Sequence, residues 1–285
     1  MSPRAIKNLA QLPDNQFLVE LSKGMRLCVL NSLQLWRDAR ILLGKDHLQG
    51  FNILKMFVEE EAAKFHILLD AARCPRQPTD ILERHLKYFT QHLAKGLYAL
   101  YYNLYSPTDL AEVRQHLYRE RQALYLDGPS NVDWVFRNDI LRQREESIYV
   151  DYVAYEDGYK KEEFWHWPDK RRLRIGLGRE RPKVLHVAAA LHGAGLTSVE
   201  ALPIVSNVWR QVTIDDSLNW SELRQVNIQT LQMIDEKGLL RRRPQTVYCS
   251  IANDWLFPLF PLDLGELQVR PEDLRKIQRS STPTD

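Results

Sequence analysis

Cysteine is scarce in this sequence. The chain has only three cysteines among 285 residues, at positions 28, 74 and 249, and none of them belongs to a CxxC pair. Disulfide frameworks and tetrahedral zinc sites both need cysteines in sets, so this pattern argues against both. We therefore expect the protein to work in a reducing environment.

Long apolar runs are also missing. No uncharged apolar stretch approaches the ~18 residues that a membrane-spanning helix needs. The N-terminal sequence MSPRAIKNLAQLPDNQF lacks the apolar region of a secretory signal. We therefore expect a cytoplasmic protein that does not enter a membrane.

The chain has no large excess of charge of either sign. Lysine and arginine number 39, aspartate and glutamate number 37, and the formal net charge is +2. This balance excludes a protein that binds nucleic acid through positive charge along its whole length. It also excludes an acidic disordered chain, and the 44% hydrophobic content is typical of a folded protein.

One short segment nevertheless carries a strong positive charge. Between Lys170 and Lys183 there are seven basic residues and one acidic residue. Such a strip can hold an RNA backbone or an acidic protein partner. The predicted nucleic-acid-binding residues are Lys170, Arg171, Arg172, Arg174, Arg179, Arg181 and Lys183.

Three long segments without internal proline begin the chain and have helical periodicity. They cover about 17–43, 47–73 and 80–105, with short connections between them, and this arrangement predicts an antiparallel helical bundle. Two shorter helices are predicted over 110–125 and 133–147, followed by a β-branched and aromatic stretch over 148–153.

The second half of the chain also favours helices. They are predicted over 182–192, 198–212 and 221–237, and the only credible strand lies over 246–251.

The predicted fold class is mainly α: an N-terminal antiparallel bundle and a smaller, mostly helical C-terminal region with little strand. The predicted divisions are a lead-in over 1–16, the bundle over 17–158, a basic linker over 159–182, a C-terminal helical region over 183–279 and a frayed tail over 280–285.

The second predicted helix has an anomaly in its apolar face. On a helical wheel, Glu60, Glu61 and Lys64 fall among its apolar residues, whereas His66, Asp70 and Arg73 fall on the opposite, polar side with other polar residues. Charges on a buried face are costly unless they are paired. Glu60 and Lys64 are spaced for a pair within the helix, so Glu61 should find its partner on a neighbouring helix.

The third predicted helix can supply such a partner. His85, His92 and Asn103 lie along one flank of its apolar stripe, and Lys95 lies about 60° further round. Two interpretations remain open for the charged group. It is either structural, as a buried network that fixes the register of the bundle or as long side chains that reach solvent at its rim, or it is a polar site inside the bundle.

Several catalytic patterns are absent from the sequence. There is no Glu-x-x-His pair for a di-iron centre, no His-Glu-x-x-His, no P-loop and no Gly-x-Ser-x-Gly. We therefore expect no metal and no cofactor. A weak RNase-like pattern is Arg181 followed by His186, with Arg179 as an alternative arginine, in which histidine would serve as acid or base and arginine would hold a phosphate.

Four pieces of the bundle together resemble the AbiV family of abortive-infection proteins, which has a HEPN-like helical domain. The pieces are Asn31 through Asp38-Ala39 to Leu42-Leu43, Glu60-Glu61-Ala-Ala-Lys64, Phe89-x-x-His92-x-x-Lys95, and Arg144-Glu-Glu-Ser-Ile-Tyr149-Val150-Asp151-Tyr152. The resemblance covers about 25–158. The sequence departs from the family from Trp165 onward, and seven residues separate Arg84 from His92, so the bundle lacks the Arg-x4–6-His motif of HEPN RNases.

The resemblance implies a prokaryotic defence protein that halts growth or translation on phage infection. It implies a bundle site lined by Glu60, Glu61, Lys64, His92 and Lys95 and closed by Tyr149 and Asp151. It also implies a phage protein or RNA as partner, and pairing into a homodimer. Two alternatives stay open: a metal-independent RNase that uses His186 and Arg181, and a non-catalytic helical interaction module.

Overall fold

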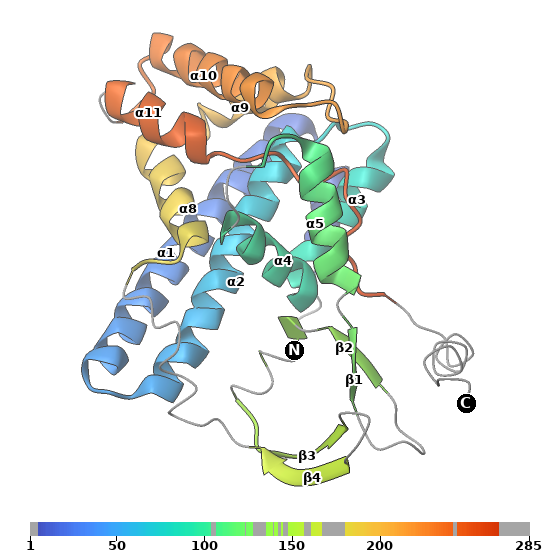
Figure 1. Cartoon of the computed structure of the whole chain (residues 1–285). Helices are drawn as coiled ribbons and strands as arrows, with labels where there is room; N and C mark the ends of the chain where they lie inside the picture. Colours follow the sequence, from blue (N-terminus) through green and yellow to red (C-terminus); the bar gives the residue numbers. More distant parts are fainter. Residues whose placement is uncertain are drawn as a thin grey trace.

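The computed structural model describes residues 5–103, 107–122, 124–127, 135–138, 140–141, 144, 148–156, 161–166, 180–241 and 244–267. These residues are mainly helical, as predicted. A short 3-10 helix, η1 (Ile6–Gln11), precedes two long helices, α1 (Asp14–Gly44) and α2 (Leu48–Arg73), which form an antiparallel hairpin (Figure 1). Both long helices begin and end within three residues of their predicted bounds.

The third predicted helix is broken into two. It forms α3 (Thr79–Lys87), a 3-10 turn η2 (Tyr88–Thr90) and α4 (His92–Asn103). No proline or glycine marks the break, and its cause lies in tertiary contacts. The buried hydroxyl of Tyr88 donates to the carbonyl oxygen of Leu262 at 3.1 Å and accepts from the amide of Leu264 at 3.1 Å.

The next part of the chain contains strands as well as a helix. The helix α5 (Leu110–Gln122) matches its prediction, and β1 (Leu124–Asp127) pairs antiparallel with β2 (Val135–Asn138). The prediction of a helix over 133–147 was therefore wrong for its first half, because β2 lies there. In the second half, residues 140, 141 and 144 are helical. A second antiparallel hairpin joins β3 (Asp151–Glu156) to β4 (Lys161–His166), and β3 overlaps the predicted β-rich stretch.

The C-terminal helices are α8 (Lys183–Ala194), α9 (Leu202–Trp209), α10 (Trp220–Glu236) and α11 (Pro244–Asp254). The first three fall where helices were predicted. The strand predicted over 246–251 was wrong, because this stretch lies inside α11. Pro244 occupies the first helical position, where its fixed φ favours a helix and its missing N–H costs nothing.

The helix α2 lies at the centre of the molecule. It contacts α1, α3, α4, α8 and α9, so residues 65–74 are buried on every side. The prediction that His66, Asp70 and Arg73 lie on a solvated face was therefore wrong, since each is only 1% exposed.

The helices of both halves of the chain share one hydrophobic core. The predicted linker over 159–182 lies mostly outside the described residues, and the domain divisions stay a prediction.

An extended segment, residues 255–265, follows α11 and crosses the bundle (Figure 1). Side chains of α2, α3, α4 and α5 hold its backbone. The carbonyl oxygens of Leu256, Phe257, Phe260 and Gly265 accept from Arg73, Tyr101, Arg84 and Arg121 in that order. The Leu259 amide donates to Asp70 at 2.7 Å. Long side chains of the first half thus fasten the last described part of the chain.

Among the described residues, no helix combines the length and the apolar character needed to cross a membrane.

Candidate functional site

Glu60 is the centre of a polar cluster formed by α2, α4 and the segment after β2. Its side chain is only 12% exposed, and three basic groups surround the carboxylate. The Nζ atom of Lys95 lies 2.6 Å from Oε2, and the Nδ1 atom of His92 lies 2.9 Å from Oε1. The Nε atom of Arg144 lies 3.2 Å from Oε1. We call these four residues the Glu60 cluster.

The structure explains why these groups meet. The break between α3 and α4 makes His92 the first residue of α4, and Lys95 follows one turn later on the same face. Both side chains therefore point at one position of α2. Lys95 is 4% exposed, so its ammonium group depends on Glu60 for charge compensation.

The electrostatics of Glu60 favour its ionised form. Burial alone would raise the pKa of Glu60, but hydrogen bonds and charges of Lys95 and His92 outweigh burial and lower this pKa below its ordinary value. Burial lowers the pKa of Lys95, against the opposing effect of Glu60.

The pairing within α2 differs from the prediction. Lys64 pairs with Glu61, three residues earlier, and its ammonium group lies 5.2 Å from the ring centre of Phe89. Glu60, and not Glu61, finds its partners on a neighbouring helix. The predicted Glu60–Lys64 pair was wrong because α4 brings Lys95 to Glu60. Glu61 and Lys64 are about 20% exposed and lie beside the cluster as a second ion pair.

His92 is the most accessible member of the Glu60 cluster, with its side chain 42% exposed. A carboxylate only accepts hydrogen bonds, so Nδ1 of His92 carries the proton that faces Glu60. In the neutral imidazole Nε2 is then a proton acceptor, and it has no hydrogen-bond partner among the described residues. This arrangement orients a histidine for acid–base chemistry at the surface of the bundle.

Sequence reasoning missed Arg144 as a site residue. In the sequence it is only the first residue of the motif that ends with Tyr152. In the structure its guanidinium lies in the Glu60 cluster, 6.0 Å from the ring centre of Phe57. The signal that could have found it is a basic residue shortly before Tyr149 in that motif.

The remaining predicted bundle residues do not join the cluster in the described part of the chain. Tyr149 is 55% exposed, with no hydrogen bond to Glu60, and the side chain of Asp151 lies outside what is described. His85 is fully buried, and its Nε2 donates to the carbonyl oxygen of Ile67 at 2.9 Å. His85 therefore lies inside the bundle, whereas Asn103 is exposed.

Most of the predicted nucleic-acid-binding strip lies outside the described residues. This holds for Lys170, Arg171, Arg172, Arg174 and Arg179. Of the strip, the structure describes Arg181 and Lys183, which are exposed just before and at the start of α8.

The alternative catalytic pair, His186 and Arg181, is exposed at the start of α8. In the described part of the chain neither side chain makes a hydrogen bond or ion pair with the other. The site assignments from the sequence stay predictions. Within the described residues, no three histidine, cysteine, aspartate or glutamate side chains gather closely enough to hold a metal ion.

Comparison with known proteins adds one match. A family model described as HEPN_AbiV, or AbiV, matches residues 20–172, which is more than half of the chain. The matched region contains the whole Glu60 cluster and ends before α8. No curated protein and no solved structure matches the chain.

Proposed function

The chain belongs to the AbiV family, and from this we propose that it defends a prokaryotic cell against phage by halting growth through RNA cleavage at the Glu60 cluster. The observation that carries the proposal is the family match, because it covers Glu60, His92, Lys95 and Arg144 together. An oriented histidine beside two basic groups suits the cleavage of a phosphodiester.

The proposed chemistry uses His92 as a base. Its Nε2 takes the proton of a ribose 2′-hydroxyl, and the 2′-oxygen attacks the neighbouring phosphorus atom. The bond from phosphorus to the 5′-oxygen breaks, and that oxygen takes a proton from the solvent. The products are a 2′,3′-cyclic phosphate and a 5′-hydroxyl end. The step involves no change of oxidation state, so it needs no oxidant or reductant.

The other members of the Glu60 cluster have distinct roles in this proposal. Glu60 is a positioning residue, because it fixes the proton on Nδ1 of His92. The guanidinium of Arg144 lies at the same carboxylate and brings a positive charge close to the imidazole, where it would attract the phosphate. Lys95 is buried and holds Glu60 in its ionised form. The basic strip from Lys170 to Lys183 would hold the RNA backbone outside the cluster.

Expression with and without phage tests the proposal. We expect the wild-type protein to reduce plaque formation and to produce transcripts with 2′,3′-cyclic phosphate ends, and we expect His92→Ala to abolish both. The matched control is His186→Ala, which removes an exposed histidine from α8 and should leave both effects intact. A melting curve for each variant shows that it is folded.

Other outcomes would overturn parts of the proposal. If His186→Ala lost activity while His92→Ala kept it, catalysis would lie at the start of α8. Halted growth with intact RNA would make the protein a binding module rather than a nuclease. A wild-type protein that neither halts growth nor restricts any phage of a broad panel would refute the defence role.

A further inference from the structure

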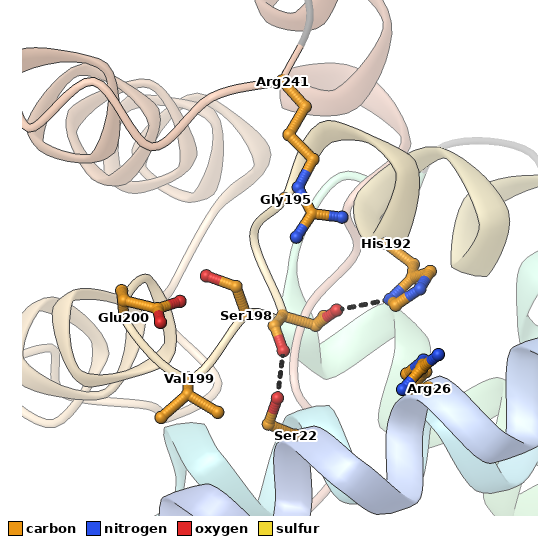
Figure 2. A pocket seen from close by; sticks show the side chains of 9 residues that line it. Ser22, Arg26, His192, Gly195, Ser198, Val199, Glu200 and Arg241 are labelled. Atoms are coloured by element: carbon orange, nitrogen blue, oxygen red, sulfur yellow. Dashed lines mark hydrogen bonds between the residues drawn. The ribbon is translucent and has the colours of Figure 1, made fainter.

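A second polar site lies away from the Glu60 cluster, between the first helix and the C-terminal half of the chain. It is a cavity of about 380 Å³ bounded by α1, the end of α8, the loop from α8 to α9 and the residue Arg241 after α10 (Figure 2). This volume is within the range of small-molecule sites. The cavity lies outside the matched region except where α1 lines it.

Two guanidinium groups face this cavity. Figure 2 shows Arg241 reaching toward Ser198 and His192 from above, and Arg26 rising from α1 on the same side as His192. In the described part of the chain neither arginine makes an ion pair or a side-chain hydrogen bond. Two arginines that line one cavity and have no ion-pair partner among the described residues suit a phosphate, which a guanidinium can bind through two parallel hydrogen bonds.

The position of Arg241 is built into the fold. Its backbone amide donates to the carbonyl oxygen of Ala194 at 3.0 Å. Gly195, which ends α8 with φ of 95°, leaves the space in which the Arg241 side chain lies. A Cβ atom at position 195 would stand 3.3 Å from Cγ of Arg241 and 2.8 Å from the carbonyl oxygen of Leu239. The glycine therefore permits the arginine to cross the helix end toward the cavity.

The inner wall of the cavity supplies neutral polar groups. Nδ1 of His192 lies 2.9 Å from Oγ1 of Thr197, and Ser22 of α1 donates to the carbonyl oxygen of Thr197 at 2.7 Å (Figure 2). Burial and then the charges of Arg241 and Arg26 lower the pKa of His192, which places both arginines within electrostatic reach of the imidazole. The Ser198 hydroxyl accepts from the Ala201 amide and keeps its own proton for a ligand.

The far side of the cavity has the opposite character. In Figure 2, Glu200 lies across Ser198 from His192 and Arg26. A carboxylate repels phosphate but accepts hydrogen bonds from hydroxyl and amino groups. The cavity is thus divided into an end that suits phosphate and an end that suits donors. A nucleoside monophosphate carries both kinds of group, a phosphate at one end and hydroxyl or amino donors at the other.

We propose that this cavity binds a nucleoside monophosphate, with the phosphate at Arg26 and Arg241 and the sugar or base donors at Glu200. The site is separate from the proposed catalytic cluster and joins α1 to the C-terminal half. Occupancy would therefore link the two halves of the chain by a ligand that bridges α1 and the α8–α9 loop.

Calorimetry and thermal melting on the full-length protein test the proposal. The probes are AMP, GMP, CMP and UMP, with inorganic phosphate and adenosine as partial ligands. We expect at least one nucleotide to bind and to raise the melting temperature, and to bind more tightly than either partial ligand. Arg26→Ala and Arg241→Ala should each weaken binding about tenfold or more, as expected for a charge-assisted contact.

Two further variants make the test specific. Arg40→Ala removes an exposed arginine from the same helix as Arg26 and should change the affinity by less than about twofold, because it is remote from the cavity. Glu200→Gln should reduce the preference for the nucleotide over inorganic phosphate.

The proposal fails if no nucleotide binds at millimolar concentration, if inorganic phosphate binds equally well, or if Arg40→Ala weakens binding as much as Arg241→Ala. It also fails if Glu200→Gln leaves the preference unchanged. Since each outcome is a binding constant, failure here leaves the RNA-cleavage proposal untouched.

Discussion

The imidazole of His66 donates from Nε2 to the carbonyl oxygen of Val184 at a distance of 2.9 Å. The two residues lie 118 positions apart, and their contact ties the centre of α2 to the first turn of α8. The imidazole also lies against the ring of Tyr102, with 4.0 Å between ring centres. A titratable side chain is therefore buried where the two halves of the chain meet.

The burial of His66 makes stability depend on pH. Burial lowers the pKa of His66 from 6.5 to about 4. The unfolded state then binds a proton more readily than the folded state, so the free energy of unfolding falls as the pH drops from 6.5 toward 4, by about 3 kcal/mol in total. Urea unfolding at pH 7 and pH 5 measures this loss. His66→Gln keeps a donor without titrating and should reduce the dependence, whereas the exposed His47→Gln should not. Equal slopes in all three proteins would contradict the assignment.

The Glu60 cluster should show strong coupling between Glu60 and Lys95. Each of Glu60→Gln and Lys95→Met removes one charge and leaves the other poorly compensated, whereas the double variant removes both. A double-mutant cycle should give a coupling energy of about 1–3 kcal/mol. The control is the exposed pair Glu20–Lys23, for which we expect no more than about 0.5 kcal/mol. Similar values for the two pairs would mean that the Glu60 cluster is open to water.

Asp70 should be the most sensitive carboxylate of α2. It is 1% exposed and accepts from Arg73, from the hydroxyl of Tyr98 at 2.6 Å and from the amide of Leu259 at 2.7 Å. Asp70→Asn leaves a buried guanidinium without its counter-charge and should cost about 3–5 kcal/mol. Asp38→Asn, near the surface of α1, should cost less than about 0.5 kcal/mol. Equal losses in the two unfolding curves would be inconsistent with this network.

Gly96 should not tolerate a larger side chain. A Cβ atom there would lie 2.3 Å from Cγ2 of Ile140, whereas a Cβ atom at Gly44 would meet nothing within 4 Å. Gly96→Ala should therefore lower the melting temperature although alanine favours helices, and Gly44→Ala should not. Adding Ile140→Ala to Gly96→Ala should restore part of the loss. If Ile140→Ala gave no rescue, the conclusion would be that the segment that carries Arg144 does not pack on α4.

The three cysteines should differ in reactivity. Cys28 and Cys74 are buried, and burial raises the pKa of both thiols to about 12, whereas Cys249 is exposed. A thiol reagent should modify one cysteine rapidly in the folded protein and all three in denaturant. Cys249→Ser should abolish the rapid phase. A rapid phase that survives this change would show that α1 or the end of α2 opens readily.

Periodicity predicted the long helices well and their surroundings poorly. The bounds of α1 and α2 could be read from apolar spacing and the breakers that flank them. The wheel of α2, however, assumes one solvated face, and His66, Asp70 and Arg73 are buried because α8 and α9 cover that face. Those helices come from more than 100 residues later, and no local pattern reports their position.

The partners of Glu60 show the same limit within the site. Spacing along one helix favoured Lys64, but the break after Tyr88 turns α4 so that His92 and Lys95 reach Glu60 instead. Glu60, His92 and Lys95 were all named from the sequence, and the structure brings the three side chains together. Which of them touch depends on how α4 packs against α2 after this break, and a wheel of one helix does not report that packing.

The extended segment over 255–265 sets the order in which the molecule can be completed. Arg73, Arg84, Tyr88 and Arg121 are synthesised early, yet their acceptors lie between residues 256 and 265. Until the ribosome has made residues 256–265, these four side chains lack the backbone acceptors that they use in the folded protein, and an unmade hydrogen bond of a buried polar group is costly. A fragment that ends with the matched family region at residue 172 would be left in the same state. A nascent or truncated chain that lacks residues 256–265 is thus held short of its final fold.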